Sequence, residues 1–85
     1  MFEVLFHKKT QKSYDKISEK TVRKFNKAIE DLRTNPFIGK DIKKLRGKLT
    51  GKYRLRIGNL RVIYRVEKDE NIILIESIGR RGNIY

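Results

Sequence analysis

The apolar residues between positions 18 and 35 recur at intervals of three and four, which gathers them on one face of a helix. This face is made of Val22, Phe25, Ala28, Ile29 and Leu32. Ser18 offers a hydroxyl group that can cap the first turn, and Asn35-Pro36 ends the helix because proline has no amide proton to donate. A shorter helix, capped by Thr10, is predicted to precede it.

Apolar and polar residues alternate with period two in two other segments, and this alternation is typical of a strand with one buried face. The first segment covers residues 2–7. The second covers residues 52–66 and is interrupted by Gly58-Asn59, a two-residue turn that accepts positive φ and fixes the register of a β-hairpin. In this hairpin the apolar face holds Tyr53, Leu55, Ile57, Leu60, Val62, Tyr64 and Val66, and the opposite face holds Arg54, Arg56, Arg61 and Arg65.

The remaining segments complete the predicted fold. Residues 68–71 form a turn into residues 72–75, which are apolar on both faces and therefore predict a central strand. Residues 37–51 are predicted to form a surface loop, in which one helical turn holds Ile42 and Leu45 against the domain. The order of elements predicts a single α+β domain over residues 1–85. Its small, twisted, mostly antiparallel four-stranded sheet carries two helices on one face and leaves the other face open.

The composition restricts the classes of protein to which this domain can belong. With 22 Lys+Arg against 10 Asp+Glu, the formal net charge is +12, which favours a polyanionic partner. The chain has no cysteine, which excludes disulfide frameworks and thiolate metal sites and favours a reducing cytoplasm. No apolar run could span a bilayer and no leader precedes the first strand, so we expect a soluble protein without a membrane partner. No grouping of His, Asp and Glu has the spacing of a metal site, and we expect no metal or other cofactor.

The positive charge is concentrated in the second half of the chain. From Lys40 to Arg61, nine Lys or Arg residues face one acidic residue, Asp41. The charge between residues 8 and 33 is mixed, as expected for a solvated helix. Since Arg54 and Arg56 alternate with core residues, they are predicted to point toward the open face of the sheet with Arg61 from the next strand. Guanidinium groups that converge there form a binding site for phosphates.

Several motifs resemble one family of proteins. Residues 53–64 have the sequence Tyr-Arg-Leu-Arg-Ile-Gly-Asn-Leu-Arg-Val-Ile-Tyr, preceded by Lys44-Leu45-Arg46-Gly47 and followed by Gly79-Arg80-Arg81 and Tyr85. Together with the Asn35-Pro36 break and the order of elements, these motifs resemble the RelE/ParE superfamily of toxins over nearly the whole chain. The basic hairpin and the Arg-rich terminus favour the RelE branch, whose members cleave messenger RNA in the ribosomal A site. The resemblance also implies a RelB-like antitoxin wrapped around the toxin, in a toxin-antitoxin heterotetramer.

The resemblance assigns roles to individual residues by position. It implies that the cleavage chemistry lies on Arg54, Arg56, Arg61, Arg81 and Tyr85. RNA contacts without chemistry are expected from Lys44, Arg46, Lys48, Lys52, Arg65 and Arg80. Arg54 and Arg56 stand where some relatives have lysine, and a guanidinium stays protonated, so the first hairpin strand offers no group that could accept a proton.

Cleavage by the ribose 2′-hydroxyl requires a base, stabilisation of extra negative charge and a proton for the departing oxygen. Tyr85 is the predicted base, and nearby guanidinium groups would have to lower its pKa from about 10. The sole histidine, His7, lies on the first strand, remote in sequence from the basic cluster, and is expected to be a partly exposed strand residue. Tyr53 and Tyr64 share the parity of the core residues and are expected to pack in the core rather than to stack on RNA bases.

Two alternative functions are compatible with the same residues. Members of the ParE branch use this fold to bind and poison DNA gyrase, and in that case the basic face would have no catalytic duty. A nucleic-acid-binding module without catalysis would account for the charge equally well. Of the three possibilities, the resemblance favours the ribosome-dependent endonuclease because of Arg81 and Tyr85.

Overall fold

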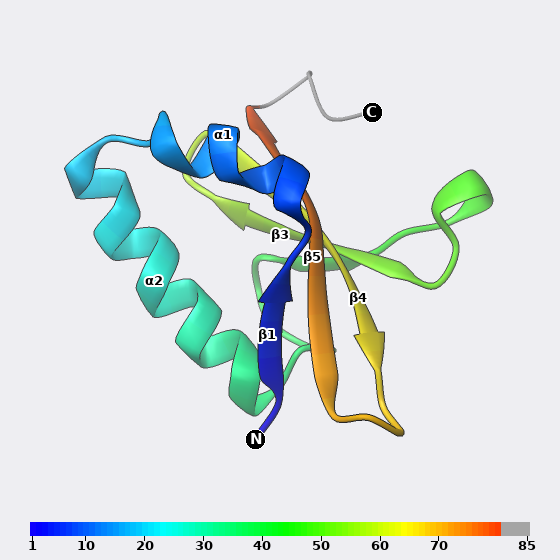
Figure 1. Ribbon diagram of the computed structural model, residues 1–85. Coiled ribbons are helices and arrows are strands. Elements are labelled where there is room, and N and C mark those ends of the chain that lie inside the picture. Colours follow the sequence, from blue (N-terminus) through cyan, green and yellow to red (C-terminus); the bar gives the residue numbers. More distant parts are fainter. Residues whose placement is uncertain (81–85) are drawn as a thin grey trace.

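The computed structural model describes residues 1–80 and shows two helices against one face of a five-stranded sheet (Figure 1). In chain order the elements are β1 (Glu3–Phe6), η1 (Lys8–Thr10), α1 (Gln11–Asp15), α2 (Glu19–Thr34), β2 (Ile42–Lys44), η2 (Gly47–Leu49), β3 (Lys52–Ile57), β4 (Leu60–Glu67) and β5 (Ile72–Arg80). The predicted α+β class is confirmed. None of the helices within residues 1–80 has the length and apolar character that a membrane crossing requires.

Helix α2 begins and ends where the sequence predicts. The hydroxyl oxygen of Ser18 accepts a hydrogen bond from the amide of Thr21 at 3.3 Å, and the helix ends at Thr34, before Asn35-Pro36. The expected cap of the shorter helix α1 is wrong. Thr10 makes no capping hydrogen bond there, because its hydroxyl donates to the carbonyl of His7 at 2.7 Å and closes the preceding turn η1.

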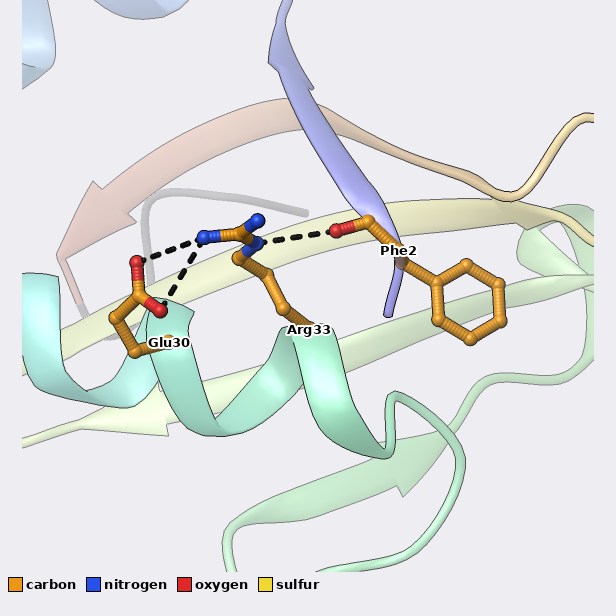
Figure 2. Close-up of polar contacts among 3 residues, drawn as sticks. All are labelled: Phe2, Glu30 and Arg33. Carbon is orange, nitrogen blue, oxygen red and sulfur yellow. Dashed lines mark hydrogen bonds and ion pairs between the residues drawn. The ribbon is translucent and has the colours of Figure 1, made fainter.

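The end of α2 is tied to the start of β1 by Arg33 (Figure 2). Its Nε donates to the carbonyl oxygen of Phe2 at 3.1 Å, while Nη1 lies 3.1 Å from a carboxylate oxygen of Glu30. The amide of Phe2 donates in return to the carbonyl of Arg33 at 2.9 Å. These contacts fix the end of α2 against the start of β1.

The predicted number of strands is wrong, because the sheet has five strands in the order β1-β5-β4-β3-β2. Strand β1 is parallel to β5, and the other neighbours are antiparallel. The additional strand is β2, which lies in the segment predicted to be a loop and pairs with β3 through Ile42↔Leu55 and Lys43↔Arg54. The expected helical turn over Ile42 and Leu45 is also wrong, because Ile42 belongs to β2, Leu45 follows it, and the short helical turn of this segment, η2, comes later at Gly47–Leu49. Three residues are too few to show a period-two pattern, so this strand exists only through its pairing with β3.

The hydrophobic core lies between α2 and the sheet. It contains Phe25, Ile29 and Leu32 from the helix, and Leu55, Ile57, Leu60, Val62, Tyr64, Ile73, Ile75 and Ile78 from the strands. The rings of Tyr53 and Tyr64 stack at 5.5 Å, and the Tyr64 hydroxyl donates to the buried carbonyl of Pro36 at 2.6 Å. Burial, and to a lesser extent the neighbouring Tyr53, raises the pKa of Tyr64. The prediction that these tyrosines pack in the core is confirmed for Tyr64, and Tyr53 is partly buried against the same core.

Candidate nucleic-acid interface

The hairpin register determines which side chains share the open face of the sheet. Gly58, with φ of 57°, and Asn59 connect β3 to β4 as predicted. Within the hairpin, Leu55 pairs with Val62 in the core. The alternating pairs on the opposite face are Lys52↔Arg65, Arg54↔Ile63 and Arg56↔Arg61. The guanidinium groups of Arg54, Arg56 and Arg61 therefore extend from one face of two adjacent strands.

The cations on this face differ in whether a carboxylate neutralises them. Nη2 of Arg56 lies 3.3 Å from a carboxylate oxygen of Asp41. Lys52 and Arg65, both expected from the sequence to contact phosphate, are also paired, the former with Glu76 at 2.7 Å and the latter with Glu67 at 2.9 Å. By contrast, no carboxylate within residues 1–80 forms an ion pair with Arg54 or Arg61. Among the cations of the hairpin, these two are therefore available to an anionic ligand without first giving up an ion pair within residues 1–80.

Arg54 has a further property that distinguishes it from its neighbours. Its Nε is buried and finds no hydrogen-bond partner among the described residues. A buried donor without an acceptor is unfavourable, and a ligand oxygen would satisfy it. The side chain borders a groove of about 920 Å³. The other residues that line this groove are Ile42, Lys43, Lys44, Leu45, Arg46 and Leu49.

Arg61 is held more loosely. Its Nη1 donates to the carbonyl oxygen of Leu60, at 3.3 Å, and Arg56 lies directly opposite it on β3. Two like charges on paired positions repel one another. An anion that bound between Arg56 and Arg61 would relieve this repulsion, so the pair favours a phosphate ligand.

The other predicted RNA contacts are distributed around this face rather than on it. Lys44 pairs with Tyr53, which places it on the helix side of the sheet, whereas Lys43 pairs with Arg54 and shares the open face. Arg46 precedes η2 and Lys48 lies within it, and both are exposed. The sequence alone did not indicate that Lys43, rather than Lys44, lies on the open face. In a strand of three residues, the face of each side chain can be assigned only when its pairing with β3 is known.

The C-terminal candidates differ in what the structure shows of them. Arg80 is the last residue of β5 and pairs with Leu60, a core residue. This pairing places Arg80 on the helix side of the sheet and not on the open face. Arg81 and Tyr85 lie outside the described residues.

His7 is exposed and accepts a hydrogen bond from the amide of Lys9 through Nδ1, at 3.1 Å. Strands β5 and β4 lie between β1 and β3, so His7 is separated from Arg54 and Arg56 by two strands. In the portion of the chain that the structure describes, no three His, Cys, Asp or Glu side chains group in a way that could hold a metal ion.

The fold and the open face define a class: a small basic α+β protein that presents guanidinium groups on the uncovered side of its sheet. A family model described as the ParE toxin of the type II toxin-antitoxin system parDE matches residues 2–85. The chain belongs to the RelE/ParE toxin superfamily and is a RelE-like toxin of a type II toxin-antitoxin system. The resemblance seen in the hairpin motif is thereby confirmed.

Three relatives illustrate the similarity. A protein of Methanocaldococcus jannaschii that bears the name toxin RelE1 is 41% identical over 86 residues, which cover 99% of this chain and 94% of the relative. The RelE of an archaeal RelE-RelB complex from Pyrococcus horikoshii OT3 is 31% identical, with a TM-score of 0.83 over 96% of this chain and 97% of that one. A chain of the heterotetrameric YoeB-YefM toxin-antitoxin complex from Staphylococcus aureus is 30% identical, with a TM-score of 0.71 over 91% of this chain and 93% of that one.

Proposed function

We propose that this toxin is a ribosome-dependent endoribonuclease that cleaves messenger RNA and so inhibits translation in the cytoplasm. The observation that carries this proposal is the pair of arginines, Arg54 and Arg61, that share the open face and form no ion pair with any carboxylate in residues 1–80. Their charges are positioned to bind a phosphodiester. RNA is the polyanion whose backbone carries, next to each phosphate, the hydroxyl group that can attack it.

The reaction follows from the chemistry of the RNA backbone. The 2′-oxygen of one ribose attacks the adjacent phosphorus while the bond from that phosphorus to the 5′-oxygen of the next nucleotide breaks. The products are a 2′,3′-cyclic phosphate and a free 5′-hydroxyl. A base accepts the proton of the attacking hydroxyl, and the leaving oxygen receives a proton. Since guanidinium groups stabilise the additional negative charge in the transition state, the scheme needs no metal ion.

Each arginine has a proposed role in this scheme. The unpartnered Nε of Arg54 offers a hydrogen bond to a phosphate oxygen. Arg61 and Arg56, paired across the two strands, stabilise the pentacoordinate phosphate from one side. Arg56 must exchange its ion pair with Asp41 for the phosphate, which is feasible because both side chains are partly exposed, at 52% and 35%.

The family resemblance extends the proposed site to Arg81 and Tyr85, with Tyr85 as the general base. A tyrosine can act near neutral pH only if positive charge lowers its pKa from about 10. Arg81 and the arginines of the hairpin are the proposed source of that charge. Arg46, Lys48, Lys44 and Arg80 are proposed to contact RNA around the site without taking part in bond cleavage.

The proposed protein partner is a RelB-like antitoxin. Its support comes from the similarity to the toxin of the RelE-RelB complex from Pyrococcus horikoshii OT3. A heterotetramer of two toxins and two antitoxins is proposed by analogy with the heterotetrameric YoeB-YefM complex. The ribosome and its bound message complete the proposed set of partners.

Inhibition of DNA gyrase is the second candidate function, because the family model that matches the chain is described as the ParE toxin. A non-catalytic nucleic-acid-binding module is the third. One experiment separates them: the purified protein is incubated with ribosomes carrying a defined message and, in parallel, with gyrase and supercoiled DNA. The proposed function predicts cleavage of the message only on the ribosome, with 5′-hydroxyl ends, and unaltered gyrase activity. An intact message together with gyrase inhibition would establish the second candidate, and an intact message with bound RNA the third.

A further inference from the structure

The carboxylate of Glu76 lies among the cations of the open face. In the pairing of β4 with β5, Ile63 faces Ser77 and Tyr64 faces Ile75, so Glu76 is an extra residue in β5, at a bulge. Its side chain is only 16% exposed. Glu76 lies 2.7 Å from Nζ of Lys52 on β3, and its second oxygen lies 3.8 Å from Nη1 of Arg65 on β4. The bulge thus directs a largely buried carboxylate toward a cross-strand pair of cations.

The two cations depend on Glu76 to different degrees. Arg65 has a second and closer partner in Glu67, whose Oε1 lies 2.9 Å from Nε. For Lys52, Glu76 is the single carboxylate partner found within residues 1–80. Loss of Glu76 would therefore free Lys52 and leave Arg65 paired.

These pairs divide the open face into two parts. Arg54 and Arg61 form no ion pair with a described carboxylate, whereas the adjacent end of the hairpin, with Lys52 and Arg65, is neutralised. A phosphate that approached Lys52 would have to displace Glu76, whose largely buried carboxylate would then keep only its 3.8 Å contact with Arg65, which is unfavourable. The RNA backbone is consequently directed toward the end that holds Arg54 and Arg61.

We propose that Glu76 is a specificity-determining residue that limits the length of RNA bound on the open face by holding Lys52 in an ion pair. This inference rests on the proposed function in one respect, that RNA is the ligand of this face. In this proposal the bulge of β5 places Glu76 beside Lys52, a role that neither the net charge nor the hairpin motif predicts. Glu76 acts through Lys52 and is a positioning residue rather than a catalytic one.

The test measures binding separately from cleavage. The probe is a single-stranded 2′-O-methyl oligoribonucleotide, which has no attacking hydroxyl group, and its affinity is measured by fluorescence anisotropy over a range of salt concentrations. Each phosphate contact on a single strand steepens the plot of log affinity against log salt concentration by about 0.7. Glu76→Gln is expected to steepen the slope by that amount and to raise the affinity about fivefold near 0.1 M salt.

Two further variants make the result specific to the ion pair. Glu70→Gln changes the net charge equally, at an exposed residue that forms no ion pair with a described side chain, and should keep the wild-type slope. Adding Lys52→Met to Glu76→Gln should return the slope to the wild-type value. Equal slopes for Glu76→Gln and Glu70→Gln would overturn the inference, as would a slope that stays steep without Lys52.

Circular dichroism establishes whether Glu76→Gln is folded. If it is not, Lys52→Gln in the wild-type chain provides the test: a slope reduced by about 0.7 would show that Lys52 already binds phosphate and would overturn the inference. Failure of the proposed function is distinguishable, because the toxin would then leave the message intact on ribosomes while the slopes of the Glu76 variants still differed.

Discussion

Replacing Arg61 by glutamine is expected to abolish most of the cleavage and to leave the fold intact. In the proposed mechanism Arg61 stabilises charge that develops on the phosphate during the reaction. Loss of one such preorganised donor lowers the rate by about 10²- to 10³-fold, equivalent to about 2.7 to 4 kcal/mol of transition-state stabilisation. Since glutamine retains much of the aliphatic stem of arginine, the substitution removes charge and hydrogen bonds more than packing.

The structure predicts a much smaller effect on stability. Within residues 1–80 the guanidinium of Arg61 makes one hydrogen bond, to the carbonyl of Leu60 at 3.3 Å, and forms no ion pair. Loss of a bond of this kind costs about 0.5 to 1.5 kcal/mol. The substitution also removes the repulsion between Arg61 and Arg56, which lie directly opposite each other, and cross-strand pairs contribute about 0.2 to 1 kcal/mol. The two contributions oppose each other, so the free energy of unfolding should change by less than about 1 kcal/mol.

The assay is single-turnover cleavage of a defined message on ribosomes, together with urea unfolding of the same preparation. Arg23→Gln is the matched control, because Arg23 is exposed on α2 and forms no ion pair with any residue of the described range 1–80. It removes the same charge away from the open face. The reasoning would be refuted if Arg61→Gln cleaved within tenfold of the wild type, or if Arg23→Gln lost as much activity. A loss of stability above about 2 kcal/mol would show that Arg61 has a structural role that this geometry does not account for.

Three further predictions concern the core and the edge of the site. Tyr64→Phe leaves the buried carbonyl of Pro36 without its donor, and urea unfolding should show a loss of about 1 to 3 kcal/mol, with cleavage per folded molecule unchanged. Because burial raises the pKa of Tyr64 above the unfolded value of about 10, its stabilising contribution is complete below pH 10 and is lost as the pH rises further. The unfolding free energy of the wild type should therefore fall more steeply than that of Tyr64→Phe above pH 10, by about 1.4 kcal/mol per pH unit, and equal slopes would contradict the assignment. Asp41→Asn should free Arg56 for phosphate and raise the affinity for the 2′-O-methyl oligonucleotide about fivefold near 0.1 M salt, whereas an unchanged affinity would exclude Arg56 from the RNA contact.

The sequence predicted the hairpin and α2 well because their signals are local. Period-two alternation, a Gly-Asn turn with positive φ at Gly58 and a serine cap are encoded within a few residues of the structure that they specify. Strand β2 could not be predicted in this way. Its three residues carry no pattern of their own, and they form a strand because the exposed edge of β3 provides hydrogen-bonding partners.

Period-two alternation predicted which hairpin residues lie on the open face. It did not predict which of their charges are neutralised by a carboxylate. Asp41 and Glu76 are separated from Arg56 and Lys52 along the chain and meet them only through the pairing of β2 with β3 and through the bulge of β5. The net charge treats every Lys and Arg as equally available to an anionic ligand. The structure shows that Lys52, Arg56 and Arg65 are each paired with a carboxylate, whereas no carboxylate within residues 1–80 pairs with Arg54 or Arg61.

The distinction between a nuclease and a gyrase ligand must rest on this chemistry, because the RelE and ParE branches share one fold. A protein that acts by binding another protein can bury its polar groups against partners of its own chain, which is the usual arrangement in folded proteins. Arg54 departs from it, since its buried Nε has no acceptor among residues 1–80, at a cost to stability of about 1 to 3 kcal/mol if no ligand completes it. A site that keeps such a donor beside Arg56 and Arg61 is arranged for an anion that arrives from outside the chain. A phosphodiester meets this requirement, and the unpartnered donor therefore supports the proposed nuclease over the gyrase ligand.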